Sequence, residues 1–75
     1  MLASKRDLAL LEGLLAQLTR QQREVFLLYE VEELTMRQVA EALDCSQNTA
    51  FSRLYAARRD LEAALKRLRA RRRVA

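Results

Sequence analysis

A length of 75 residues allows one domain with a single small core. Apolar residues make up 51% of the chain and charged residues 32%, with one glycine and no proline, which favours helices over turns. No window alternates apolar and polar residues as a half-buried strand would, and no uncharged apolar run approaches the roughly 18 residues of a membrane span. We therefore expect an all-α protein that does not enter the membrane.

The cysteine and histidine contents exclude two further kinds of site. The single cysteine, Cys45, cannot form a disulfide within the chain, and histidine is absent, so a zinc site would have too few ligands. Without histidine, a glycine loop or a nucleophile beside a base, we expect neither an enzyme nor a cofactor. The leucine-rich start lacks the cleavage pattern of a signal peptide, and the cysteine content fits the cytoplasm.

The net charge of +4 is divided unevenly along the chain. Residues 1–44 carry five basic and eight acidic side chains, whereas residues 45–75 carry nine basic and two acidic ones. A basic half of this kind is the electrostatic footprint expected for a protein that binds a polyanion. The alternative is a solubilising tail, but the basic residues already begin within a long predicted helix.

We expect the first helix over residues 5–17, because Ser4 and Asp7 have the spacing of a variant capping box. Its apolar face consists of leucines at helical spacing: Leu8, Leu11, Leu15 and Leu18, widened by Leu10 and Leu14. Gly13 lies in the middle of this helix, where glycine costs about 1 kcal/mol relative to alanine. Close approach of a second helix would explain this glycine.

Thr19 and Gln22 predict the start of the second helix, because a threonine followed three residues later by glutamine forms a capping box. The buried face of this helix is expected to contain Val25, Phe26, Leu28 and Tyr29. Further along, Glu30, Glu32 and Glu33 place negative charge where the helix macrodipole is also negative. We therefore expect the second helix to end early or to fray in this stretch.

The same signal, Thr35 followed by Gln38, predicts a third helix within residues 34–43, and Ser46 predicts the start of a fourth. The two starts lie only eleven residues apart. Asp44 occupies the turn between the helices, and aspartate is among the residues that tolerate a left-handed backbone. This spacing predicts a helix-turn-helix, in which the second helix enters the DNA major groove.

The fourth helix is predicted to be long. Apolar residues recur at every third or fourth position for more than five turns: Ala50, Leu54, Ala57, Leu61, Leu65 and Leu68. Its C-terminal half either packs on the first or second helix or projects as a partner-binding arm. Residues 70–75 are expected to form a basic, frayed tail with Arg71, Arg72 and Arg73 in solvent. Residues 1–75 together form one four-helix domain with a long C-terminal recognition helix.

The outward face of the fourth helix follows from its buried face, because successive residues are about 100° apart. With Ala50 at the centre of the buried side, the opposite side presents Asn48, Ser52, Tyr55 and Arg59. The candidates for contact with base edges are Asn48, Thr49, Ser52 and Tyr55, and those for phosphates are Arg53, Arg58 and Arg59. Phe51 is either a DNA contact or a lid over the core, and ordinary packing is the alternative for Tyr55.

Three blocks of sequence occur in the order and spacing of a known family. They are LTRQQREVFLL at residues 18–28, LTMRQVAEAL at residues 34–43, and LDC followed by NTAFSRLYAARR through residue 59. In these blocks the chain resembles region 4 of the sigma-70 family of bacterial transcription initiation factors. The resemblance is strongest to the small extracytoplasmic-function (ECF) group and covers roughly residues 8–65.

This resemblance implies that the fourth helix reads the promoter −35 element and that an apolar groove accepts the flap-tip helix of the RNA polymerase β subunit. An anti-sigma factor is a further candidate partner. The implied DNA-binding residues are Thr35, Arg37, Gln38, Gln47, Asn48, Thr49, Phe51, Ser52, Arg53, Tyr55, Arg58 and Arg59. The regions that recognise and melt the −10 element have no counterpart in 75 residues, so an excised domain or a standalone remnant is expected.

The chain departs from the family pattern at several of these positions. Basic residues are common in the family where this chain has Phe51 and Ala56, and often where it has Tyr29. Glycine is frequent where it has Glu33 and Asn48. We therefore expect weaker binding to the −35 element or an altered sequence preference.

Two other functions remain open. One is a protein-docking module with weak DNA binding, in which the apolar groove and an acid cluster, formed by Glu30, Glu32 and Glu33, bind a flap helix, an anti-sigma factor or an activator. The other is a helix-turn-helix regulator of the LuxR type, whose DNA-binding domain has a similar four-helix plan. Such domains commonly dimerise through their last helix.

Overall fold

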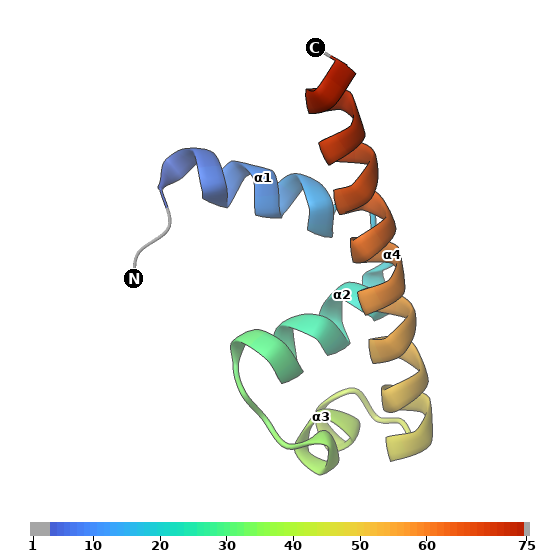
Figure 1. The fold of residues 1–75 in the computed structure, drawn as a ribbon. Coiled ribbons are helices and arrows are strands. Elements are labelled where there is room, and N and C mark those ends of the chain that lie inside the picture. The colour runs from blue at the N-terminus through green and yellow to red at the C-terminus, as the bar shows by residue number, and fades with distance from the viewer. Residues whose placement is uncertain (1–3, 75) are drawn as a thin grey trace.

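The fold is all-α and is built along one long helix. A computed structural model describes the backbone of residues 4–74 and the side chains of residues 4–71. In order, the elements are α1 (Lys5–Leu15), α2 (Arg20–Phe26), the π-helical segment η1 (Leu27–Val31), α3 (Met36–Ala42) and α4 (Gln47–Val74). The shorter helices all lie along one side of α4 (Figure 1). None of the helices in the described part of the chain is long and apolar enough to cross a lipid bilayer.

All four α-helices have a side-chain cap at the N-terminus, as predicted. Thr19 and Thr35 each form a reciprocal capping box with the glutamine three residues later, in which the glutamine Oε1 accepts the threonine amide at 2.9 Å. Ser4 and Ser46 each accept one backbone amide of the first helical turn, at 3.2 and 3.1 Å. Because each cap satisfies amides that have no partner within the helix, these four positions fix where the helices start.

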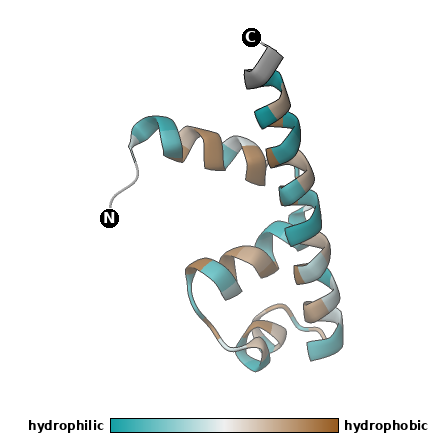
Figure 2. Cartoon of the chain, viewed as in Figure 1, coloured by the Kyte–Doolittle hydropathy of each residue, from teal (hydrophilic) through white to brown (hydrophobic). Residues whose placement is uncertain are grey.

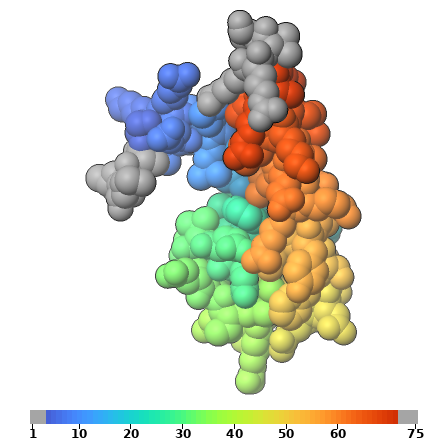
Figure 3. All heavy atoms as spheres, in the orientation of Figure 1, coloured from blue at the N-terminus to red at the C-terminus, as the bar shows by residue number. Residues whose placement is uncertain are grey.

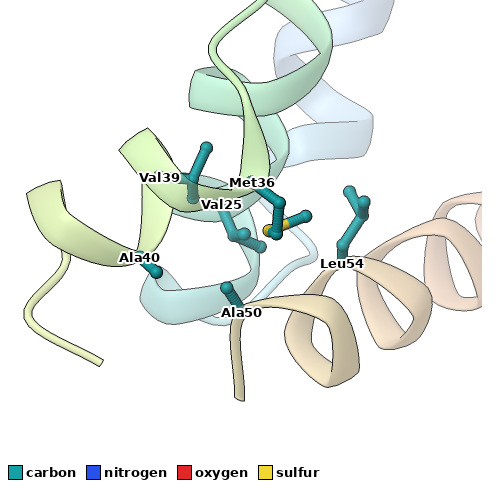
Figure 4. Close-up of a cluster of buried hydrophobic side chains, with 6 residues drawn as sticks. All are labelled: Val25, Met36, Val39, Ala40, Ala50 and Leu54. Atoms are coloured by element: carbon teal, nitrogen blue, oxygen red, sulfur yellow. The ribbon is translucent and has the colours of Figure 1, made fainter. Parts of the chain in front are cut away.

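The core lies where α2, α3 and the first half of α4 meet. Figure 4 shows its buried cluster, made of Val25, Met36, Val39, Ala40, Ala50 and Leu54. The residues that α4 contributes are mostly small: Ala50 and Ala57 are fully buried, and Ala64 is 2% exposed. Since alanine places little side-chain volume between helices, the backbone of α4 lies close to its neighbours while Leu54 fills the space between them.

The C-terminal half of α4 packs on α1, which decides between the two arrangements that the sequence left open. The 28 residues of α4 span about 42 Å, and the longest dimension of the molecule is 44 Å. Hydrophilic and hydrophobic bands alternate along α4 because one side of it faces these neighbours (Figure 2). In the space-filling view α1 lies against the second half of α4, beyond the body formed by α2 and α3 (Figure 3).

Three details of the predicted helices differ from the structure. The first helix ends at Leu15 rather than at Gln17. Close helix approach does not explain Gly13, because a Cβ atom placed there would meet no atom within 4 Å. The tail expected to fray from residue 70 is helical through Val74, in continuation of α4, while the side chains of Arg72 and Arg73 lie outside the described ones.

The prediction that the second helix ends early or frays at the glutamates is wrong. The helix widens instead into η1, where the amide of Glu32 donates to the carbonyl of Leu27, five residues earlier, at 2.9 Å. The chain then leaves the helix through Glu33, whose backbone has a φ of 58°. The prediction for the other turn is confirmed, because Asp44 also has a left-handed backbone, with a φ of 53°.

The left-handed conformation of Glu33 predicts a stabilising substitution. In this conformation the Cβ atom of a non-glycine residue clashes with the following carbonyl oxygen, which raises the free energy of the folded state, whereas glycine has no Cβ atom and adopts it freely. Glu33→Gly is expected to raise the free energy of unfolding by about 1 kcal/mol, which corresponds to roughly 5 °C in the midpoint of thermal unfolding followed by circular dichroism.

Glu32→Gly is the matched control, because it removes the same charge at a residue whose φ is −80°. It should leave the midpoint unchanged or lower it. A Glu33→Gly variant no more stable than Glu32→Gly would contradict the proposed strain.

Candidate nucleic-acid interface

The first three turns of α4 present a polar face opposite the core. Ala50 and Leu54 are buried on the inner side, and the residues at the opposite pole are all exposed: Asn48, Ser52, Tyr55 and Arg59. Gln47, at the start of α4, is also exposed but lies about 60° around the helix from Ala50. Tyr55 is 60% exposed although it is an aromatic residue. The structure thus brings together on one surface the residues that the sequence predicted as the outward face.

The residues flanking this polar face are partly buried. Thr49 and Arg53 are half-buried on one flank, and Phe51 is half-buried on the other. The Thr49 hydroxyl accepts a hydrogen bond from the Ser46 hydroxyl at 2.9 Å, and the Thr49 amide donates to the same Ser46 oxygen at 3.1 Å. Thr49 therefore helps to cap α4 and keeps its methyl group and the hydroxyl hydrogen for a further contact.

The start of α3 adds a second exposed group of predicted residues. Thr35, Arg37 and Gln38 are all exposed. The side chains of Thr35 and Gln38 are already hydrogen-bonded in the capping box. Arg37 forms only a 3.5 Å ion pair with Glu41 one turn later, and its side chain is 80% exposed. A pair this exposed contributes little to stability, so the guanidinium is available to a phosphate.

Arg58 points away from the polar face toward η1. Its guanidinium is paired with the Glu30 carboxylate, to which Nε donates at 3.0 Å, and it lies over the Tyr29 ring at 5.9 Å from the centroid. The hydrogen bond with Glu30 raises the pKa of Arg58 above its ordinary value. The sequence groups this arginine with Arg53 and Arg59 as phosphate ligands; in the structure its guanidinium is engaged by Glu30, and its side chain is 45% exposed.

Sequence reasoning did not connect Glu30 and Tyr29 with Arg58, although the family resemblance marks Tyr29 as a position that is often basic. They lie 28 and 29 positions before Arg58, and neither periodicity nor a capping signal links them to it. The packing of α2 against α4, with η1 continuing α2, brings the three side chains together.

Arg59 remains available although an acid neighbours it. Its Nε lies 3.4 Å from Asp60 Oδ1, and its side chain is 74% exposed. Asp60 is turned toward α2, where Gln22 donates to Oδ2 at 2.9 Å. This hydrogen bond, with the nearby charge of Arg59, holds the pKa of the Asp60 carboxyl below its ordinary value. The Gln22–Asp60 hydrogen bond thereby joins α2 to α4 one residue beyond the polar face.

A capped helix-turn-helix whose second helix is basic and has a polar outward face defines a DNA-binding domain. The particular family is shown by residues 8–61, which match the family model described as sigma-70, region 4. The chain belongs to this family. Searches among curated proteins and among solved structures find no match to the chain.

Membership implies the role of a sigma factor in transcription initiation, with DNA binding at the promoter −35 element. Region 4 is a DNA-binding domain and not a catalytic one. The match also favours a sigma factor over the LuxR-type regulator that the helix plan alone left open.

From the Glu30–Arg58 pair we predict that removing the carboxylate of Glu30 strengthens DNA binding. Glu30→Gln takes away the carboxylate that holds Arg58, so the guanidinium becomes free to contact a phosphate. We expect the dissociation constant for a mixed-sequence duplex at low salt, measured by fluorescence anisotropy, to fall by about two- to fivefold.

Glu12→Gln is the control, since it removes the same charge from α1. The double variant Glu30→Gln/Arg58→Ala should lose the gain. If Glu30→Gln binds no more tightly than Glu12→Gln, the pair does not restrain Arg58.

Proposed function

We propose that this domain belongs to an ECF-type sigma factor, works in the bacterial cytoplasm, and reads the −35 element with the first half of α4. The observation that carries the proposal is the continuous polar face of α4, exposed opposite a core that fixes the helix in a helix-turn-helix. The ECF assignment is supported by the three sequence blocks and their spacing.

The side chains on this face suit different parts of a duplex. Asn48 can pair with an adenine edge through two hydrogen bonds, and Ser52 can donate to or accept from any base. Gln47 and Thr49 lie at the first turn of α4, where base edges and phosphates are both within reach. The remaining cationic groups, Arg37, Arg53 and Arg59, suit the phosphates on either side, with Thr35 and Gln38 beside Arg37.

This assignment predicts sequence-dependent and strongly salt-dependent binding. With about three phosphates neutralised by these arginines, the logarithm of affinity should fall with the logarithm of salt concentration at a slope of roughly −3. Arg59→Ala should weaken binding to all sequences about equally and make the slope shallower by about 0.9, whereas Asn48→Ala should change the sequence preference with the slope unchanged.

The measurement is fluorescence anisotropy on −35-like and scrambled duplexes over a range of salt concentrations. Lys5→Ala is the matched control for Arg59→Ala, because it removes one exposed positive charge from α1. Equal affinity for the two duplexes would overturn the proposal that α4 reads the −35 element.

A groove between α1 and the second half of α4 supports docking on the polymerase. It encloses about 200 Å³ and is lined mainly by Leu10, Gly13, Leu14, Ala64 and Leu68. Arg67 bounds it, with Nη2 donating to Gln17 Oε1 at 2.8 Å. An apolar groove of this kind accepts the apolar face of a helix. We assign it to the flap-tip helix of the β subunit, and an anti-sigma factor that covers it would compete with the flap.

The acid cluster of Glu30, Glu32 and Glu33 offers less to such a partner than the sequence indicated. Glu30 is engaged by Arg58, while Glu32 and Glu33 remain exposed at the end of η1. We therefore place docking in the groove rather than on the acid cluster.

The open space at Gly13 provides a test of this docking site. Gly13→Leu should fill the groove without disturbing the fold, since a Cβ there meets no atom within 4 Å and leucine is a better helix former than glycine. Binding to a labelled β-flap domain should weaken about tenfold because the partner helix is displaced.

Gly13→Ala is the control, because it improves helix propensity and leaves the groove open. Both variants should bind DNA as the wild type does. Flap binding by Gly13→Leu at the wild-type level would place the docking site elsewhere.

A further inference from the structure

Two aromatic rings form an exposed platform on the reading face of α4. Phe51 and Tyr55 lie one turn apart, and their rings are stacked with centroids 6.0 Å apart and planes inclined by 23°. Phe51 is half-buried against the core cluster, whereas Tyr55 is 60% exposed. The half-buried ring of Phe51 thus supports the exposed ring of Tyr55. Little further side-chain entropy is lost when a ligand covers the Tyr55 ring.

The Phe51 side of this platform offers few free hydrogen-bond donors. The guanidinium of Arg58 on that side is paired with Glu30 and lies over Tyr29. Ala56, the residue after Tyr55, has no polar group. Guanine is read in the major groove chiefly by a donor pair from arginine or lysine. On the Phe51 side of α4 the only such pair, that of Arg58, is engaged, and the exposed guanidinium of Arg59 lies one turn beyond Tyr55 at the outward pole.

We infer that the Phe51–Tyr55 platform reads the 5-methyl groups of thymines in the major groove and makes a thymine-containing step, rather than guanine, the preferred sequence on this flank of α4. This inference rests on the proposed function, because it requires that the first half of α4 enters the groove. The thymine methyl is the only apolar group that a base pair displays there, and an aromatic face gains free energy by covering it. The hydroxyl of Tyr55 stays at the exposed edge, where it can reach water or a phosphate.

The test uses the duplex that the wild-type chain enriches most strongly from a random library, together with copies in which one thymine at a time is replaced by deoxyuridine. This replacement removes only the methyl group. We expect one or two adjacent replacements to weaken wild-type binding by about fourfold each. The Tyr55→Ala variant should bind the thymine and uracil duplexes equally, because its contact surface is gone.

Three variants separate the platform from other sources of the effect. Tyr55→Phe keeps the ring and should keep the thymine preference, and Thr49→Ser removes the other methyl group near the bases and should keep it too. Phe51→Arg should replace the preferred thymine by guanine in a renewed selection, since it introduces a donor pair. Circular dichroism of each variant verifies the fold.

Each result bears on the inference in one direction. Wild-type binding that is indifferent to every uracil, while the selected duplex is still preferred over a scrambled one, overturns the inference and leaves the proposed function intact. Thymine discrimination that persists in Tyr55→Ala also overturns it. No preference for the selected duplex over a scrambled one overturns both proposals.

Discussion

The small side chains on the inner face of α4 are the constraint on which the remaining structure depends. Ala50, Ala57 and Ala64 recur at seven-residue intervals and are all buried. Because their side chains are small, α2, α3 and α1 can all approach the backbone of this 28-residue helix closely. Enlarging any of them would force neighbouring helices apart, at a cost of about 1–3 kcal/mol for each. A domain of this size has little stability to lose.

This packing also decides which charges are available to DNA. Because α2 packs on α4 and η1 continues α2, Glu30 meets Arg58 and Gln22 meets Asp60. The first contact engages a cation beside the surface proposed for DNA, and the second turns an anion toward α2. The first half of α4 carries three arginines, of which Arg59 and the half-buried Arg53 are not engaged by Glu30. The basic character of the second half of the sequence therefore overstates the positive charge that the proposed DNA-binding surface offers.

Much of the fold could be predicted because its signals are local. A cap is formed by two residues three positions apart, so the four helix starts were visible in the sequence, as was the left-handed turn at Asp44. The outward face of α4 followed from the same periodicity, because burial on a helix repeats with its turn. The position of Ala64 in the core could have been found from its seven-residue spacing to Ala57.

The pairing of Arg58 with Glu30 could not be predicted in this way, because it joins residues 28 positions apart in the chain. The η1 segment carries no capping or periodicity signal, and the stacking of Tyr55 on Phe51, although the two lie one helical turn apart, depends on how both rings are turned. Phe51 illustrates this limit. The sequence left it between a DNA contact and a lid over the core, and the structure shows that it packs on the core cluster while it supports an exposed ring.

The unbroken course of α4 has a mechanical consequence. The surface proposed for DNA and the groove proposed for the polymerase lie on one rod, with Ser52 and Leu68 about 24 Å apart along its axis. Each residue between them adds about 1.5 Å and 100° of rotation. Deleting a single residue there would preserve the chemistry of both surfaces and yet turn one away from the other. The length of this helix therefore sets the distance and the rotation between the surface proposed for the promoter and the groove proposed for the polymerase.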